Sequence, residues 1–119
     1  NRGEMSDAIV ESVDVFPTLC DMTSLSIPSF TEGISLKPLI ENPDTTGHEA
    51  VAYISNATTI RTDQYRFTQH KDGAVELYDH QNPLGEQLNI AEHNPKIVQE
   101  LRTLLLSKTA DKAFIYSNK

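Results

Sequence analysis

The chain is poor in several residue types, and each shortage excludes a class of protein. It has a single cysteine, Cys20, among 119 residues, which excludes an internal disulfide. Its five glycines are widely spaced, so a glycine-rich phosphate-binding loop is absent. Ten basic residues face 17 acidic ones, the net charge is −7, and the basic residues do not cluster. Binding to nucleic acid or to an anionic membrane through general electrostatics is therefore not expected.

Long apolar runs are missing as well. No stretch approaches the roughly 20 residues needed to cross a bilayer, so we expect no membrane segment. A hydrophobic content of 38% suits one modest globular domain or part of a larger one. The first residues, Asn1-Arg2-Gly3, include no initiator methionine, and this favours a fragment, a processed chain or a trimmed sequence.

What is present centres on a predicted β-meander. Residues 65–70 alternate in the period of a half-buried strand. Asp72-Gly73 tolerates positive φ, so the chain can turn back into a second strand at 75–79. Residues 59–62 can pair on the near side, and Ala50–Ile54 is a further candidate strand. The pattern predicts a four-stranded antiparallel sheet.

The clearest helix start in the chain is Asn94-Pro95, an Asn cap followed by proline at the first helical position. Apolar residues follow at i, i+4, i+7 and i+8, which places one stripe on the sheet: Ile97, Leu101, Leu104 and Leu105. A small sheet with one helix packed on one face is an α+β fold. The segment Phe114-Ile115-Tyr116 has two interpretations, an edge strand or a tail.

The first 45 residues do not complete this fold. Ala8–Val13 has the length and composition of a strand, and Asp14 is placed to cap a short helix over residues 15–23. Phe16, Leu19, Cys20 and Thr23 would share its buried face. A loop follows, and the breaker cluster Asn42–Gly47 marks a boundary. Such a strand, helix and loop would bury little surface alone, as expected for the end of a larger domain.

Five short motifs occur in the order and spacing found in sulfatases. They resemble the patterns V-D-x-x-P-T-L, G-x-S-L-x-P-L, I-R-T-x-x-Y-R-Y-T, E-L-Y-D and N-x-A, and lie at Val13–Met22, Glu32–Ile40, Ile60–Thr68, Glu76–His80 and Asn89–Ala91. Phe67 replaces the second tyrosine of the third pattern. The chain is therefore similar to the C-terminal portion of a sulfatase, in the iduronate-2-sulfatase-like branch.

The resemblance implies a division of the chain. Residues 1–45 would be the tail end of the catalytic α/β domain, and residues 46–119 the C-terminal subdomain. Sulfatases carry a calcium ion and a formylglycine upstream, the latter made within C/S-x-P/A-x-R. Cys20 is followed by Asp21-Met22, which does not fit that pattern. No catalytic residue, metal ligand or cofactor is expected in this chain; calcium and formylglycine are implied for the upstream domain.

The candidate site residues are few. Four histidines, His48, His70, His80 and His93, lack the short fixed spacings of zinc ligands, so surface positions are favoured. His80 and His70, near strand ends, are the candidates for a substrate pocket. Arg61 has two interpretations: binding a sulfated or carboxylated sugar through its planar fork, or pairing with a buried carboxylate or with loop carbonyls.

Two functions fit these observations. The first is the C-terminal fragment of a sulfuric ester hydrolase that acts on sulfated sugars such as glycosaminoglycans. Its partners would be the upstream catalytic domain and a sulfated carbohydrate, and the fragment would be inactive alone. The alternative is a free-standing glycan-binding or interaction module derived from such a domain. The resemblance implies a periplasmic, secreted or lysosomal full-length enzyme, whereas the particular ester and the oligomeric state have no signal in the sequence.

Overall fold

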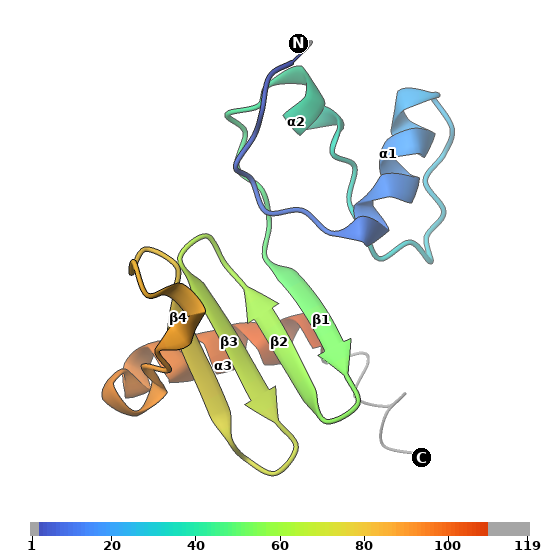
Figure 1. The fold of residues 1–119 in the computed structure, drawn as a ribbon. Helices are drawn as coiled ribbons and strands as arrows, with labels where there is room; N and C mark the ends of the chain where they lie inside the picture. Colours follow the sequence, from blue (N-terminus) through green and yellow to red (C-terminus); the bar gives the residue numbers. More distant parts are fainter. Residues whose placement is uncertain (1–2, 110–119) are drawn as a thin grey trace. The chain divides into compact units, whose positions relative to one another are not determined.

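A computed structural model describes residues 3–109 and divides the chain into two compact units, residues 1–50 and 51–119 (Figure 1). The predicted boundary at residues 45 and 46 lies near this division. The assignment of residues 1–45 to the end of a catalytic domain stays a prediction. Phe114–Tyr116 lies outside the described residues. Within the described part, no helix is both long and apolar enough to span a membrane.

The first unit contains two short helices, α1 (Val15–Met22) and α2 (Lys37–Glu41), and a 3₁₀ turn at Ser12–Asp14. The predicted short helix is confirmed. The predicted strand at Ala8–Val13 is wrong: residues 8–11 are irregular and lead into the 3₁₀ turn. A strand needs a neighbouring strand to pair with. Here the Ile9 carbonyl accepts a bond from the His48 N–H at 3.2 Å, which is a single bond and not a ladder.

The predicted buried face of α1 is wrong in part. Cys20 is buried as expected, together with Pro17 and Thr18, whereas Phe16 and Leu19 are exposed. Helical spacing identified the apolar residues, but within this unit there is too little chain to cover both sides of the helix. Part of its apolar surface therefore faces outward.

The first two sequence motifs bind each other through short polar contacts. The Asp14 carboxylate accepts the Ile34 N–H at 2.9 Å, and the Thr18 hydroxyl accepts the Leu36 N–H at 2.8 Å. The approach is so close that a Cβ at Gly33 would lie 2.2 Å from the Val13 carbonyl oxygen. Only glycine fits there, so the glycine of the second motif is required by the first.

The second unit is a four-stranded antiparallel sheet in the order β1-β2-β3-β4 (Figure 1). Its strands are β1 (Ala50–Ile54), β2 (Ala57–Arg61), β3 (Tyr65–His70) and β4 (Val75–Asp79). Two 3₁₀ turns follow, Gly85–Gln87 and Ala91–His93, and then α3 (Pro95–Thr109), which crosses one face of the sheet. The predicted α+β arrangement of sheet and helix is confirmed.

The core of this unit lies between the sheet and α3. Ile60, Phe67 and Leu77 sit opposite one another on β2, β3 and β4 and have no exposed surface. The helix contributes buried Val98, Leu101 and Leu105, and Ile97 and Leu104 pack partly buried beside them. Two of the four residues in the predicted stripe, Leu101 and Leu105, are thus in the core, and the other two flank it.

The substitution Leu101→Ala should lower the free energy of unfolding by about 2–5 kcal/mol, because it removes buried methyl groups and leaves a cavity. Leu106→Ala on the same helix is the matched control, since Leu106 is 61% exposed and Leu101 only 7%. Urea unfolding followed by circular dichroism measures both. A loss below about 0.5 kcal/mol for Leu101→Ala, the size typical of surface positions, would mean that α3 does not pack through this residue.

Candidate functional site

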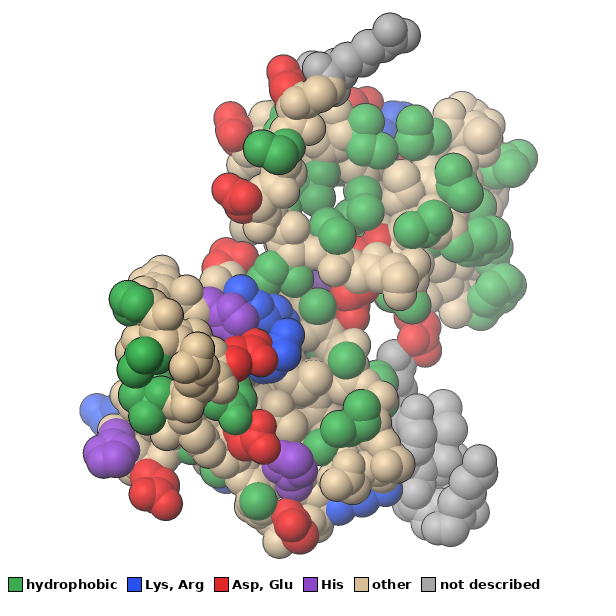
Figure 2. All heavy atoms as spheres, viewed as in Figure 1, with side chains coloured by type: hydrophobic (Ala, Val, Ile, Leu, Met, Phe, Trp, Pro, Cys, Tyr) green, Lys and Arg blue, Asp and Glu red, His purple; other side chains and the backbone are tan. Residues whose placement is uncertain are grey.

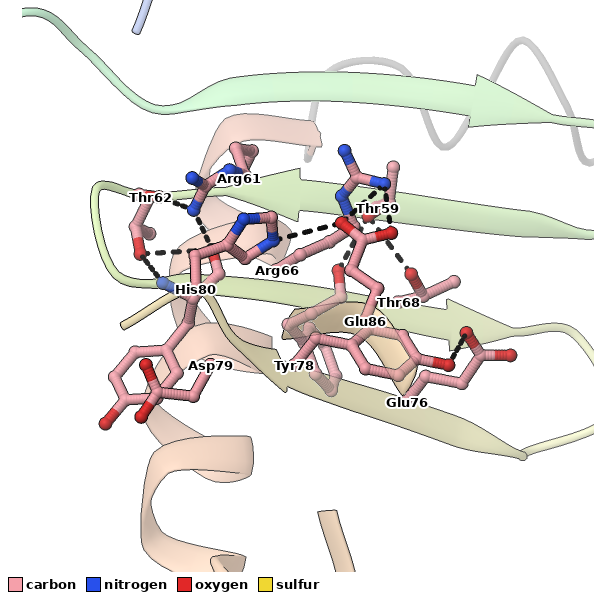
Figure 3. Close-up of polar contacts among 12 residues, drawn as sticks. Thr59, Arg61, Thr62, Arg66, Thr68, Glu76, Tyr78, Asp79, His80 and Glu86 are labelled. Carbon is pink, nitrogen blue, oxygen red and sulfur yellow. Dashed lines mark hydrogen bonds and ion pairs between the residues drawn. The ribbon is translucent and has the colours of Figure 1, made fainter. Parts of the chain in front are cut away.

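The face of the sheet opposite α3 is polar. Side chains alternate between the two faces of each strand. The neighbours of Ile60 on β2, of Phe67 on β3 and of Leu77 on β4 therefore point away from the helix. We call this surface the open face; it carries Thr59, Arg61, Arg66, Thr68, Glu76 and Tyr78 (Figure 3), and His70 at the end of β3. In Figure 2 basic, acidic and histidine side chains lie next to one another on this unit.

A groove of about 360 Å³ lies on the open face. Residues from all four strands line it, together with Glu86 from the turn after β4. At its floor the Thr68 hydroxyl donates to the Thr59 hydroxyl at 3.1 Å, and the Thr59 hydroxyl donates to the Phe67 carbonyl at 3.0 Å. The sheet therefore builds the floor, and longer side chains stand around it.

Glu86 joins two basic side chains at one end of the groove. Its two carboxylate oxygens lie 2.9 and 3.0 Å from the Arg66 Nη1 atom, and the His80 Nε2 atom lies 3.0 Å from one of them (Figure 3). The Arg66 and Glu86 side chains are 41% and 40% exposed. These contacts hold the turn after β4 against the sheet while leaving the charged groups within reach of solvent.

Glu76 joins two further groups. The His70 Nε2 atom lies 3.0 Å from one carboxylate oxygen, and the Tyr78 hydroxyl donates to the other at 3.1 Å. Burial raises the pKa of Tyr78 above its ordinary value, and its hydrogen bond to Glu76 raises it further. The phenol therefore stays a neutral hydrogen-bond donor at any ordinary pH.

Arg61 lies opposite Arg66 in the register of β2 and β3. Its Nη1 atom donates to the Thr62 carbonyl and lies 3.4 Å from the carbonyl oxygens of Asp63 and Tyr65 (Figure 3). The side chain thus binds carbonyl groups of the turn that follows it. Its role toward a sugar stays a prediction.

Of the three residues singled out from the sequence, Arg61 and His70 lie on the open face, and only His70 lines the groove. His80 reaches the groove through Glu86, and Arg61 is turned toward the β2–β3 turn. Sequence reasoning missed Arg66 and Glu86 as site residues. The alternation of β3 could have placed Arg66 beside His70, whereas Glu86 sits in an irregular turn that gives no periodic signal.

A second polar cluster lies in the first unit and centres on Asp14, which is fully buried. One carboxylate oxygen accepts the Glu11 N–H at 2.7 Å and lies 2.7 Å from the His48 Nε2 atom, and the other accepts the Ile34 N–H. The predicted helix cap is confirmed in position but not in its bonds: Asp14 is the N-cap residue of α1, yet its side chain accepts no bond from the N–H groups of that helix. The carboxylate instead joins three separate segments.

The electrostatics of this pair favour the charged forms. Burial would raise the pKa of Asp14, but the two backbone N–H groups and His48 outweigh it, and the net pKa is lowered. Burial would likewise lower the pKa of His48, but Asp14 and the Glu49 carbonyl raise it on balance. The His48 Nδ1 atom lies 3.1 Å from that carbonyl, so both ring nitrogens face acceptors, as an imidazolium requires.

The described residues do not form a metal site. Between residues 3 and 109, no group of three or more His, Cys, Asp or Glu side chains is arranged to hold a metal ion. Cys20 is buried on the inner side of α1.

Comparison with known proteins gives consistent relatives, although no protein-family model matches the chain. A sulfatase from Formosa agariphila is 31% identical over 114 residues, covering 91% of this chain and 22% of that protein. A delta 4,5-hexuronate-2-O-sulfatase from Bacteroides thetaiotaomicron is 30% identical over 107 residues, covering 79% of this chain and 22% of that protein. The chain spans about a fifth of the length of these curated relatives.

A solved structure has the same fold. It is a protein in complex with its substrate D-glucosamine-2-N,6-O-disulfate, and it aligns with a TM-score of 0.78 and 27% identity. The alignment covers 91% of this chain and 25% of that one. Both units of the chain therefore fall within the matched region.

Proposed function

Because this chain belongs to the sulfatases, as the C-terminal portion of such an enzyme, we propose that it completes a sulfuric ester hydrolase whose reaction centre lies in the upstream portion. The similarity predicted from the five motifs is confirmed, and the hexuronate-2-O-sulfatase relative agrees with the iduronate-2-sulfatase-like branch. The chain's own task would be to support the catalytic domain and to shape one side of the substrate pocket.

The observation that carries this proposal is the apolar surface of the first unit. Large hydrophobic side chains are exposed along it, and Figure 2 shows many of them on the visible side: Met5, Val10, Val13, Val15, Phe16, Leu19, Met22, Leu25, Ile27, Phe30, Ile34 and Ile40. A mostly apolar groove of about 550 Å³ runs between α1, α2 and residues 4–10. Apolar surface on this scale marks a protein interface. The partner that fits is the remainder of the enzyme.

Calcium and formylglycine would belong to that upstream portion. The described residues contain no arrangement for a metal ion, and Cys20 is buried and lacks the flanking sequence for formylglycine. The residues present do not fit either group. In this proposal the chain's own part is to hold and orient substrate and partner.

The substrate class follows from the relatives. One relative is a hexuronate sulfatase, and the protein in the solved structure has a disulfated glucosamine as its substrate. A sulfated sugar is the corresponding proposal for this enzyme. His80, His70 and Arg61 remain the candidates for pocket contacts, since His70 and Arg61 lie on the open face, His80 contacts Glu86 at its edge, and all three carry hydrogen-bond donors.

The test is hydrolysis of a chromogenic aryl sulfate by three samples: this chain, the upstream portion, and both together. This chain alone should give no turnover, and the mixture should exceed the upstream portion by at least about tenfold, since the completed pocket orients the substrate. Turnover by this chain alone would contradict the proposal. No gain on mixing, together with glycan binding by the chain, would favour the free-standing module instead.

A matched pair of variants locates the interface. Leu19→Asn places an amide in the apolar groove of the first unit, whereas Leu106→Asn changes a similarly exposed leucine on α3. The gain on mixing should fall with Leu19→Asn and persist with Leu106→Asn. If the two substitutions reduced the gain equally, the apolar groove would not be part of the interface.

A further inference from the structure

The groove on the open face has more carboxylates than guanidinium groups. Arg66 is its one arginine, and Glu76 and Glu86 are its two carboxylates. Both oxygens of Glu86 lie within hydrogen-bond distance of the Arg66 Nη1 atom, at 2.9 and 3.0 Å. The positive charge is therefore already compensated by a neighbour. The groove does not present an unbalanced cation to its ligand.

This balance disfavours an anionic ligand. A sulfate in the groove would face two carboxylates and one guanidinium whose charge is already paired, and like charges at such separations repel. The groove is thus a poor site for the sulfate ester itself, although it lies on the face that carries the sugar-contact candidates.

The side chains that line the groove are suited to binding the hydroxyl groups of a sugar. A sugar hydroxyl both donates and accepts, and the groove offers acceptors on Glu76 beside donors on Arg66. The contacts of Arg66 with Glu86 are made through Nη1 alone, and a guanidinium carries five N–H donors. The Tyr78 ring adds an apolar surface among them. At about 360 Å³ the groove is at the small end of ligand pockets.

The side chains are also held in place before a ligand arrives. Glu76 is fixed by His70 and Tyr78, and Glu86 by Arg66 and His80. Little side-chain entropy would be lost on binding, which favours affinity. The carboxylates keep unused lone pairs and Arg66 keeps unused N–H donors, so a hydroxyl can join the network without breaking a bond.

We infer that this groove binds an uncharged, hydroxyl-bearing sugar unit of the glycan, and not the sulfated unit that is hydrolysed. The inference rests on the proposed function only for the class of ligand, a glycan. It adds a second contact point, at which Arg66, Glu76 and Tyr78 recognise hydroxyls.

The test is a titration of the ¹⁵N-labelled chain, observed by NMR, with N-acetylglucosamine and separately with D-glucosamine-2-N,6-O-disulfate. N-acetylglucosamine should shift the amide signals of Thr59, Thr68 and Tyr78 in a saturable way. The disulfate should bind these positions at least threefold more weakly. Absence of shifts at these amides, or tighter binding of the disulfate, would overturn the inference.

Variants separate recognition from folding. Arg66→Gln should weaken binding of N-acetylglucosamine about tenfold, the cost of losing a charged hydrogen bond. Arg102→Gln is the matched control, because Arg102 bonds to Gln69 from α3 on the covered face. If Arg66→Gln disturbs the whole spectrum, Tyr78→Phe decides: its spectrum should keep the folded pattern and binding should fall about threefold. Unchanged binding in Tyr78→Phe, or equal losses in Arg66→Gln and Arg102→Gln, would refute the assignment.

The outcome is independent of the hydrolysis assay, because binding is measured on this chain alone. Failure of the mixed samples to hydrolyse an aryl sulfate would leave the titration unaffected. Failure of the titration would leave the role of the chain in the enzyme intact.

Discussion

The substitution Asp14→Asn is expected to lower the free energy of unfolding of the first unit by about 3–5 kcal/mol, the range for removing one partner of a buried charged pair. The carboxylate serves the N–H groups of Glu11 and Ile34 and the imidazole of His48, all within 2.9 Å. An asparagine offers one acceptor oxygen and turns an amide nitrogen toward groups that are themselves donors. The three segments that Asp14 joins would separate.

Hydrogen exchange at the Glu11 and Ile34 amides measures this effect directly, since both bonds end on the carboxylate. Asp44→Asn, at an exposed position of the same unit, is the control and should leave exchange unchanged. Exchange that is as slow in Asp14→Asn as in the unchanged chain would show that the pair does not hold the unit together.

The same pair sets a pH window. The pKa of His48 is raised above 6.5 in the folded state, so its contribution is complete below 6.5 and is lost as pH rises through the raised value. The pKa of Asp14 is lowered below 3.8, so its contribution is complete above 3.8 and is lost as pH falls through the lowered value. Protection of these amides should be greatest between these limits, and Asp14→Asn should flatten the profile.

Phe67→Ala should destabilise the second unit by about 3–5 kcal/mol. Phe67 is fully buried and is paired with Ile60 on one side and Leu77 on the other. Removing its ring opens a cavity between β2, β3, β4 and α3. Phe30→Ala is the control, since Phe30 is 79% exposed and should change the unfolding free energy little.

Urea unfolding of both variants provides the measurement, with the slope of the transition compared as well. An unchanged slope means that the loss is in stability and not in the compactness of the folded state. A Phe67→Ala loss no larger than that of Phe30→Ala would place the core elsewhere.

The sheet and the last helix could be predicted because their signals are local. The alternation in residues 65–70 and the Asn94-Pro95 start depend on neighbours in sequence, and the structure has both elements. The prediction of a strand at Ala8–Val13 was wrong because strand formation depends on a partner that is distant in sequence. An apolar run of strand length becomes a strand only when another strand lies beside it, and that partner cannot be read from the run itself.

The polar clusters could not be predicted for a similar reason. Asp14 binds Ile34 and His48, which lie 20 and 34 residues away in sequence, and no periodic pattern links such positions. The sequence alone predicted that the Asp14 carboxylate accepts bonds from the first turn of α1, whereas in the structure it binds Ile34 and His48. Glu86 reaches Arg66 across 20 residues from a turn without a repeating pattern. For the open face, the usable signal was the alternation of side chains along the strands, which places Arg66 beside His70 on β3 and Glu76 beside Tyr78 on β4.

The contacts between the first two motifs have a consequence for assembly. Asp14 with Ile34, Thr18 with Leu36, and Ser35 with Asp21 at 2.6 Å close the loop between α1 and α2 with bonds internal to the unit. The exposed apolar side chains are therefore presented on a scaffold that is ordered before any partner binds. Docking then resembles the meeting of two rigid surfaces, so its rate should depend on collision and orientation, with no folding step to slow it.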